Sequence, residues 1–197
     1  MRKIAEHMAL LIAEEVGYDK DGLNFQRIRY GLEILLSVSI TMMVLMAVAV
    51  LSSLKGSLMM VALSSGLLRL VSGGAHAKRF YRCLLIGTAL CLVGGYGAVV
   101  GVVPDEWLPM GIVSAGFIGL IVVYKYVPVA TKAKPITEPQ RRRRFQILSA
   151  CFLVLWVGIS LFLLPKERVL VTASFFGVTW QLFTLTPAGI SVYEILG

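Results

Sequence analysis

Six apolar runs, separated by short polar segments, constrain this chain more than any other feature. A membrane-spanning helix needs about 20 mostly apolar residues, and most of the runs approach that length. Only 15% of the 197 residues are charged, whereas soluble globular domains have about 25%. The sequence therefore predicts an all-α integral membrane protein, folded as a single membrane-embedded domain over residues 1–197. The predicted spans cover approximately residues 30–54, 58–71, 83–103, 108–126, 145–164 and 169–185.

The first residues show helical rather than spanning periodicity. Apolar side chains recur at steps of three and four, with acidic residues and His7 between them. Gly17 is well placed to end such a helix. We therefore predict an amphipathic helix over residues 2–17 that lies on the membrane or packs on the helical bundle. The recurring apolar residues are Ile4, Met8, Leu11, Ile12 and Val16.

The basic residues predict an orientation. The chain has a net charge of +8, and 16 of its 19 Lys and Arg lie in the N-terminal segment, in residues 69–82 and in residues 125–144. The opposite turns hold Lys55, Lys166 and Arg168. By the positive-inside rule, six spans then place both termini on the cytoplasmic side. Because the charges lie between apolar runs, we expect no nucleic-acid partner.

Residues 69–83, RLVSGGAHAKRFYRC, are polar and basic between two apolar runs. They contain His76 and Cys83, a possible base and nucleophile. A thiol attacks a carbonyl as its thiolate, which nearby positive charge and a helix N-terminus favour. Arg79 and Arg82 lie close before Cys83 in the sequence and supply such positive charge. Cys83 should also be a free thiol, because cytoplasmic thiols stay reduced. No second His or Cys stands at ligand spacing nearby, so we expect no metal and no cofactor.

Geometry restricts how His76 can assist Cys83. In one straight helix the seven intervening steps would separate them by roughly 10 Å, whereas a general base needs a contact of roughly 3 Å. The chain must therefore fold back, and Ser72-Gly73-Gly74 offers the flexible break. A continuous helix from Gly74 through Cys83 would contradict this arrangement. The residue types alone also allow an interpretation without catalysis, in which His76 is a solvated side chain and Cys83 only packs against its neighbours.

At this stretch the sequence resembles the AgrB family, the accessory gene regulator B proteins of Gram-positive quorum sensing. The resemblance rests on Arg69, on SGGAHA with His76, and on Cys83. Two other regions agree: RYGLEILLS at residues 29–37 and VPVATKAKPI at residues 127–136, with its Lys-Pro-Ile sequence. Together they extend over nearly the whole chain.

The resemblance implies a membrane-embedded cysteine endopeptidase that acts on an AgrD-like propeptide. His76 would be the base and Cys83 the nucleophile, leaving an acyl-enzyme thioester. A Cys or Ser of the precursor would then attack the thioester and close a thiolactone or lactone ring, giving an autoinducing peptide. Basic side chains would attract the acidic part of the precursor, or serve only as topology signals. The supporting and substrate-binding candidates are Glu33, Arg69, Ser72, Gly73, Gly74, Lys78, Arg79, Lys132, Lys134, Pro135 and the arginines at 141–144.

Two of these candidates have a second interpretation. Glu33, near the start of the first span, either reaches the interface or faces the bundle interior. In the second case Glu33 could orient His76, and Ser72 is the other candidate for that role.

From the family we expect a homodimer in the cell membrane of a Gram-positive bacterium, in contact with membrane lipid and with the active site on the cytoplasmic side. The alternatives are a small membrane exporter of a peptide, or a structural, lipid-binding membrane protein.

Overall fold

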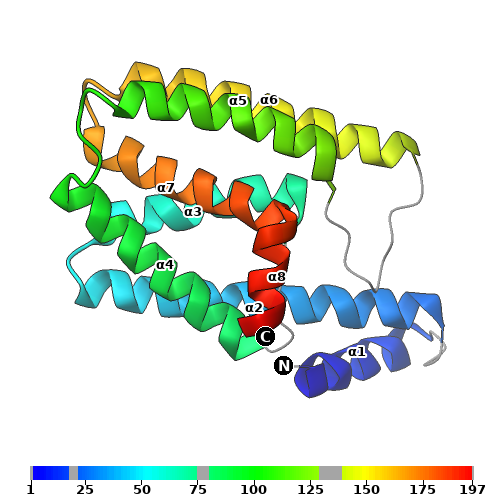
Figure 1. Cartoon of the computed structure of the whole chain (residues 1–197). Coiled ribbons are helices and arrows are strands. Elements are labelled where there is room, and N and C mark those ends of the chain that lie inside the picture. Colours follow the sequence, from blue (N-terminus) through cyan, green and yellow to red (C-terminus); the bar gives the residue numbers. More distant parts are fainter. Residues whose placement is uncertain (1, 18–21, 75–79, 129–138, 197) are drawn as a thin grey trace. The chain divides into compact units, whose positions relative to one another are not determined.

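The computed structural model describes residues 2–17, 22–74, 80–128 and 139–196, and the regular elements in these ranges are all helices (Figure 1). The all-α prediction is therefore confirmed. The helices form two compact units, Met1–Val48 and Ala49–Gly197. In chain order they are α1 (Arg2–Val16), α2 (Leu23–Leu51), α3 (Lys55–Ser72), α4 (Phe80–Val100), α5 (Leu108–Tyr126), α6 (Pro139–Leu163), α7 (Arg168–Leu185) and α8 (Pro187–Leu196).

The first unit consists of α1 and most of α2. Its core contains Ala9, Ala13 and Phe25, so small side chains let the two helices approach closely. Gly17, with a φ of 73°, ends α1 as expected. The large apolar side chains of the predicted amphipathic face remain exposed on α1 (Ile4, Met8, Leu11, Ile12 and Val16). The helix itself is confirmed, while its place on the membrane or on the bundle stays a prediction.

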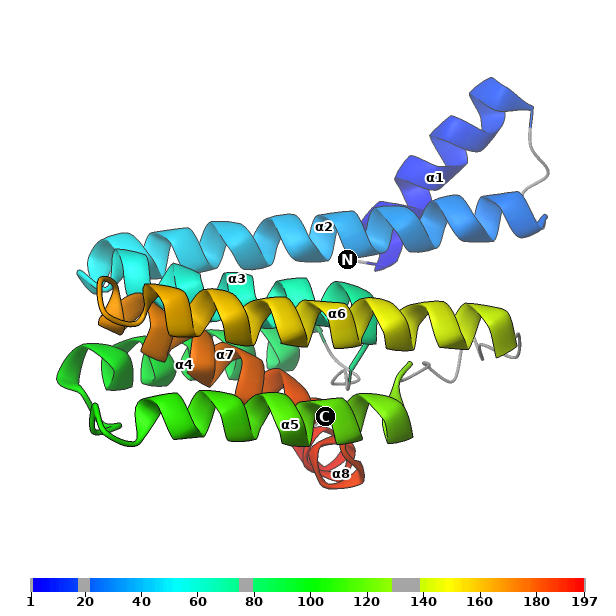
Figure 2. The ribbon, with the colours of Figure 1, turned by 90° about the horizontal axis from the view of Figure 1, so that it is seen from above.

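The second unit is built around α7, which contacts α3, α4, α5, α6 and α8. Its most extensive pairing is with α3, and the two helices lie side by side in Figures 1 and 2. Lipid is as apolar as a leucine side chain, so close packing rather than the hydrophobic effect must hold such helices together. Fully buried side chains of its core include Leu68, Leu108, Ile112, Leu153 and Leu185.

Glycines set the closest approaches in this unit. A Cβ at Gly177 of α7 would collide with Ser64 Oγ and Val61 O of α3. A Cβ at Gly95 of α4 would lie 3.1 Å from the Leu58 backbone of α3. Gly95 and Gly177 therefore permit close helix packing within the unit.

Five described helices, α2, α4, α5, α6 and α7, are long and apolar enough to cross a membrane. The chain is thus a multi-pass helical membrane protein, and the predicted span at residues 108–126 coincides with α5. Helix α3 corresponds to the predicted span at residues 58–71 but falls short of this test, since it carries serines and Arg69. The sixth span, the cytoplasmic position of both termini and the single domain stay predictions.

Two helix boundaries differ from expectation. Helix α6 begins at Pro139, whose fixed φ suits a first helical position, so the four arginines belong to its first turns rather than to a loop. The residues after Thr186, which lie beyond the last predicted span, form α8. Figures 1 and 2 show α8 turning sharply away from the axis of α7.

Candidate functional site

The segment predicted to break the chain direction does so. Helix α3 ends at Ser72, and Gly73 N donates to Arg69 O at 2.9 Å. Gly73 and Gly74 have φ values of 74° and 153°, a region that favours glycine. Since Gly74 lies outside any helix, a continuous helix from Gly74 through Cys83 does not exist. Helix α3 therefore ends at the Ser72-Gly73-Gly74 sequence that was predicted to break the helix, and the two glycines adopt the conformations that allow it.

A buried amide from α7 holds this break. Gln181 Nε2 donates to Gly73 O at 2.7 Å and to Ser72 Oγ at 3.3 Å. Thr184 Oγ1 lies within hydrogen-bond distance of both Gln181 O, at 2.8 Å, and Gln181 Oε1, at 3.3 Å. Only 1% of Gln181 is exposed. Buried polar groups are costly unless they are paired, so these bonds fix the position of the Ser72–Gly73 backbone.

Gly74 lies against the same network. A Cβ there would lie 3.0 Å from Gln181 Nε2, 3.1 Å from Thr184 Oγ1 and 3.8 Å from Arg69 Nε. The side chain of Arg69, from the last turn of α3, therefore borders Gly74. The end of α3, the break and the end of α7 form one polar junction.

Cys83 lies in the first turn of α4, is partly buried and is a free thiol. Arg82 is engaged with its neighbour, since its Nε donates to Tyr81 Oη at 3.3 Å and its guanidinium lies 5.9 Å from the Tyr81 ring.

Helix α8 brings a further titratable group to Cys83. Tyr193 is 3% exposed, and burial raises the pKa of its phenol above the ordinary value. The positive charge of Arg69 and hydrogen bonds from Trp180 and Arg69 oppose this rise in the pKa, while the charge of Cys83 adds to it. Arg69 of α3 and Cys83 of α4 therefore both act electrostatically on Tyr193 of α8.

The other predicted site residues lie in the first unit, in α6 or outside the described residues. Glu33 lies in α2, partly buried, in the first unit, and its carbonyl oxygen accepts a bond from Ser37 Oγ at 2.7 Å. The four arginines at 141–144 are exposed at the start of α6. The predicted residues outside the described ranges are His76, Lys78, Arg79, Lys132, Lys134 and Pro135.

Sequence reasoning missed Gln181, Thr184, Trp180 and Tyr193. Gln181 had a signal, because it is an amide within an apolar run and such a group must find a partner inside a membrane. Tyr193 had none, since a lone tyrosine in a short tail says nothing about its neighbours.

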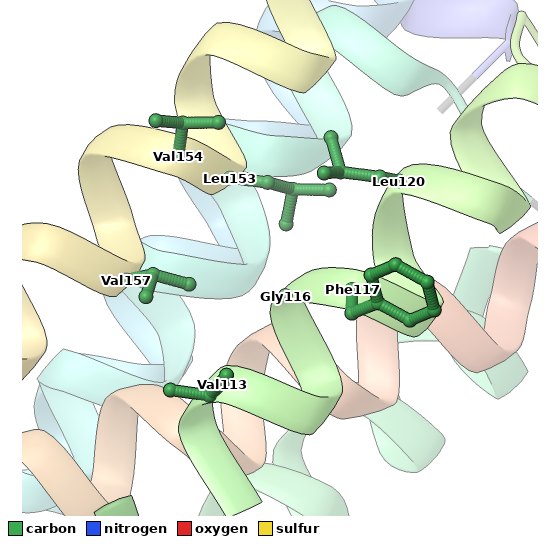
Figure 3. Close-up of a pocket in the computed structure, with 7 residues that line it drawn as sticks. All are labelled: Val113, Gly116, Phe117, Leu120, Leu153, Val154 and Val157. Atoms are coloured by element: carbon green, nitrogen blue, oxygen red, sulfur yellow. The ribbon is translucent and has the colours of Figure 1, made fainter. Parts of the chain in front are cut away.

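An apolar hollow between α5 and α6 is not part of this junction (Figure 3). Its wall contains no acid, base or nucleophile, and no lining residue comes from α3, α4 or α8. Gly116 lets the helices meet closely there, because a Cβ would lie 2.5 Å from Val157 Cγ2. The lining residues are Val113, Gly116, Phe117, Leu120, Leu153, Val154 and Val157.

The five helices of spanning length and the polar junction beside Cys83 define a multi-pass helical membrane protein with a candidate thiol site at the start of one helix. The chain belongs to the AgrB family: the sequence profile of that family, accessory gene regulator B, matches residues 5–185. The resemblance seen in the sequence is therefore confirmed, and membership implies an accessory gene regulator B role in quorum sensing.

Relatives extend along most of the chain. A putative AgrB-like protein 2 of Clostridium perfringens (strain 13 / Type A) is 24% identical over 201 residues, covering 93% of this chain and 92% of the relative. A putative AgrB-like protein of Listeria monocytogenes serotype 4b (strain F2365) is 23% identical over 93% of this chain and 87% of its own. The accessory gene regulator protein B of Staphylococcus saprophyticus is 28% identical over 73% of each chain. No solved structure gives a significant match.

Proposed function

We propose that this protein is a membrane-embedded cysteine endopeptidase that cuts an AgrD-like signal propeptide and cyclises the retained part. The single observation that carries the proposal is Cys83 itself, a free, partly buried thiol in the first turn of α4. Its surroundings support it, because Arg69 and Tyr193 act on the same site and the Gln181 network fixes the nearby chain break.

In the proposed first step, His76 takes the Cys83 proton and the thiolate attacks a peptide carbonyl of the precursor. The C–N bond breaks, the leaving amine receives the proton from His76, and the retained acyl group stays on Cys83 Sγ as a thioester. In the second step a Cys or Ser of the precursor attacks that thioester. Its proton returns through His76, Cys83 leaves as the thiolate, and a thiolactone or lactone ring closes.

The second step is an exchange rather than a strongly downhill reaction when the precursor nucleophile is a thiol, because one thioester replaces another. Its rate therefore depends on holding the internal nucleophile close and keeping water out. We propose that the partly buried position of Cys83 at a helix start leaves the thiol open to the precursor while it limits exposure to bulk water.

Charge supports a precursor with an acidic part. The four arginines at the start of α6 are exposed, and clustered positive charge attracts acidic peptide. We propose that this basic end faces the cytoplasm of a Gram-positive cell, and that the protein works there as a homodimer among membrane lipid. Rising salt concentration should then weaken precursor binding, since exposed charges are screened.

The second candidate function is export of a peptide. Ion-coupled transport paths usually contain acids or bases inside the membrane. The polar side chains that are buried in the described part of the chain are Ser, Thr and Gln, all uncharged. This composition favours the endopeptidase.

The decisive experiment is precursor processing in lipid vesicles by the purified protein and by Cys83→Ala, read by mass spectrometry. Cys151→Ala is the matched control, because Cys151 is also a free cysteine but lies in the middle of α6. We expect Cys83→Ala to lose processing and Cys151→Ala to retain it. Continued cleavage by Cys83→Ala would refute the endopeptidase.

A further inference from the structure

We propose that a site between α5 and α6 binds one anionic phospholipid, whose headgroup contacts Arg143 and whose acyl chain fills the apolar hollow of Figure 3. This site goes beyond the proposed function, because its ligand is a lipid and Cys83 takes no part in it. The inference follows from the charge at the start of α6, from the position of the hollow below that charge, and from the exposure of the walls of the hollow.

The headgroup end of this site is positively charged. The arginines at residues 141–144 lie in the first turns of α6 and are exposed. Figures 1 and 2 show these turns extending beyond the end of α5. No acid within the described residues pairs with these arginines, and the ion pair of Arg168 with Asp105 lies beyond the opposite ends of the two helices. Clustered cations at a membrane surface attract the headgroups of anionic lipids.

The end of α5 marks the level of the membrane surface. Gln146 Nε2 of α6 donates to Tyr124 O of α5 at 3.0 Å, so the two helices lie side by side at this level. The side chain of Tyr124 is exposed, and exposed tyrosines gather where a membrane meets water. The headgroup level of the site therefore lies near Tyr124, with the hydrocarbon of the bilayer on the side of the hollow.

Helical periodicity places Arg143 above the hollow. On α6 the hollow is lined by Leu153, Val154 and Val157. Arg143 and Val154 are eleven positions apart. That separation is about three turns and about 16 Å along the axis, so the two residues lie on one face of α6. Arg141, in contrast, lies about 170° around the helix from the centre of the hollow, on the opposite face.

The depth and lining of the hollow suit an acyl chain. The hydrocarbon core of a bilayer is about 30 Å thick, so a point about 16 Å from the headgroup contact lies well inside it. The volume of the hollow is about 210 Å³, less than the roughly 300–1,000 Å³ of pockets that enclose whole small molecules. A segment of one chain fits this space. An acidic peptide would contact the arginines but would leave the apolar hollow empty.

The hollow is open toward the outside of the helix pair. Val113 and Phe117 of α5 and Val154 of α6 line it, and each is more than half exposed. Figure 3 shows side chains of both helices bordering the hollow. In a multi-pass membrane protein, such exposed apolar side chains meet lipid, whose tails are as apolar as leucine. The bilayer therefore supplies the occupant directly.

The test of the headgroup contact is native mass spectrometry of the full chain in detergent micelles, titrated with dioleoyl phosphatidylglycerol or dioleoyl phosphatidylcholine. The two lipids have the same acyl chains and differ in net headgroup charge. We expect the wild type to bind phosphatidylglycerol more tightly and Arg143→Gln to weaken that binding about fivefold, the usual contribution of one basic side chain near anionic headgroups. Arg141→Gln is the matched control, because it removes the same charge from the opposite face; its dissociation constant should stay within about twofold of the wild type.

A second pair of variants tests the hollow. Val154→Trp fills the hollow, whereas Leu155→Trp adds the same bulk to the next exposed side chain, which does not line it. Both positions are exposed, so neither variant disturbs the core. We expect Val154→Trp to weaken phosphatidylglycerol binding about fivefold, because the displaced chain loses about ten van der Waals contacts. Leu155→Trp should bind as the wild type does.

Three results would overturn the inference. They are equal binding of the two lipids by the wild type, equal weakening by Arg143→Gln and Arg141→Gln, and unchanged binding by Val154→Trp. If Val154→Trp changed nothing and a polyglutamate peptide displaced the lipid, the arginines would bind peptide, and the lipid site would fail on that ground too. The assay contains no precursor, so its outcome is independent of whether Cys83→Ala still cleaves.

Discussion

Replacing Gln181 with leucine tests whether the chain break is held by a specific hydrogen bond. Leucine is close in size to glutamine, so the buried space stays filled while the donor to Gly73 O disappears. That bond is 2.7 Å long and partly buried, and only 1% of Gln181 is exposed. Leaving a buried acceptor short of its donor costs about 1–3 kcal/mol.

The loss of this hydrogen bond should change both the stability of the protein and its processing of the precursor. Denaturant unfolding in micelles should show a free energy of unfolding lower by about 1–3 kcal/mol. Precursor processing should fall by more than the unfolded fraction explains, because Ser72 and Gly73 lose the anchor that sets the course of the chain toward the site. Gln181→Glu is a second variant, since it keeps the acceptor for Thr184 Oγ1 and removes the donor for Gly73 O.

A matched control exists on α6. Gln146 Nε2 also donates to a backbone carbonyl, Tyr124 O, at 3.0 Å, but this bond is exposed. Water can replace it, so Gln146→Leu should change the free energy of unfolding by less than about 1 kcal/mol and leave processing intact. If Gln181→Leu matched the wild type in both stability and processing, the reasoning about the buried amide would be refuted.

The remaining predictions concern packing, backbone conformation and pH. Gly177→Ala should destabilise the protein by about 1–3 kcal/mol in denaturant unfolding, because its Cβ collides with α3; Gly158→Ala, which meets open space in α6, should be neutral or slightly stabilising. Gly74→Ala should cost about 1–3 kcal/mol and reduce processing, because its positive φ is strained for alanine and its Cβ presses on Gln181 and Thr184. The folded-state pKa of Tyr193 is raised above the unfolded value of about 10, so its contribution to stability is complete below that pH and declines as pH rises further. Tyr193→Phe should remove this part of the alkaline loss; an identical alkaline unfolding curve would contradict it.

The sequence predicted most of the fold because membrane spans are recorded locally. The apolar run at residues 108–126 and its polar boundaries predicted both ends of α5 correctly. The break at Ser72–Gly74 followed from two adjacent glycines. The predicted span at residues 145–164 left out the first turns of α6, since four arginines look solvated whether or not the backbone is helical. The face by which α1 packs, which contains Ala9 and Ala13, was also missed, because alanines give a weaker hydrophobic signal than the larger apolar residues beside them.

The site was less predictable because its parts come from distant segments. Cys83 could be proposed from its basic neighbours, but Gln181 lies 108 positions from Gly73 along the chain, and no local pattern joins them. Tyr193 needed the reversal at Thr186 and Gly189, which depends on a close approach to the Phe183 carbonyl. Such contacts arise only when several helices are packed together.

One face of α7 carries both a close contact with α3 and the hydrogen bond to the chain break beside the candidate site. Gly177 and Gln181 are one turn apart, so they lie on the same side of the helix. Gly177 meets Val61 and Ser64 in the middle of α3, and Gln181 meets Gly73 just beyond its end. A helix is stiff over one turn of about 5.4 Å, so the close contact at the glycine sets the depth at which the amide reaches the break. The small residue that lets two helices pack thus also places the hydrogen bond that shapes the thiol site, although it touches neither Cys83 nor Tyr193.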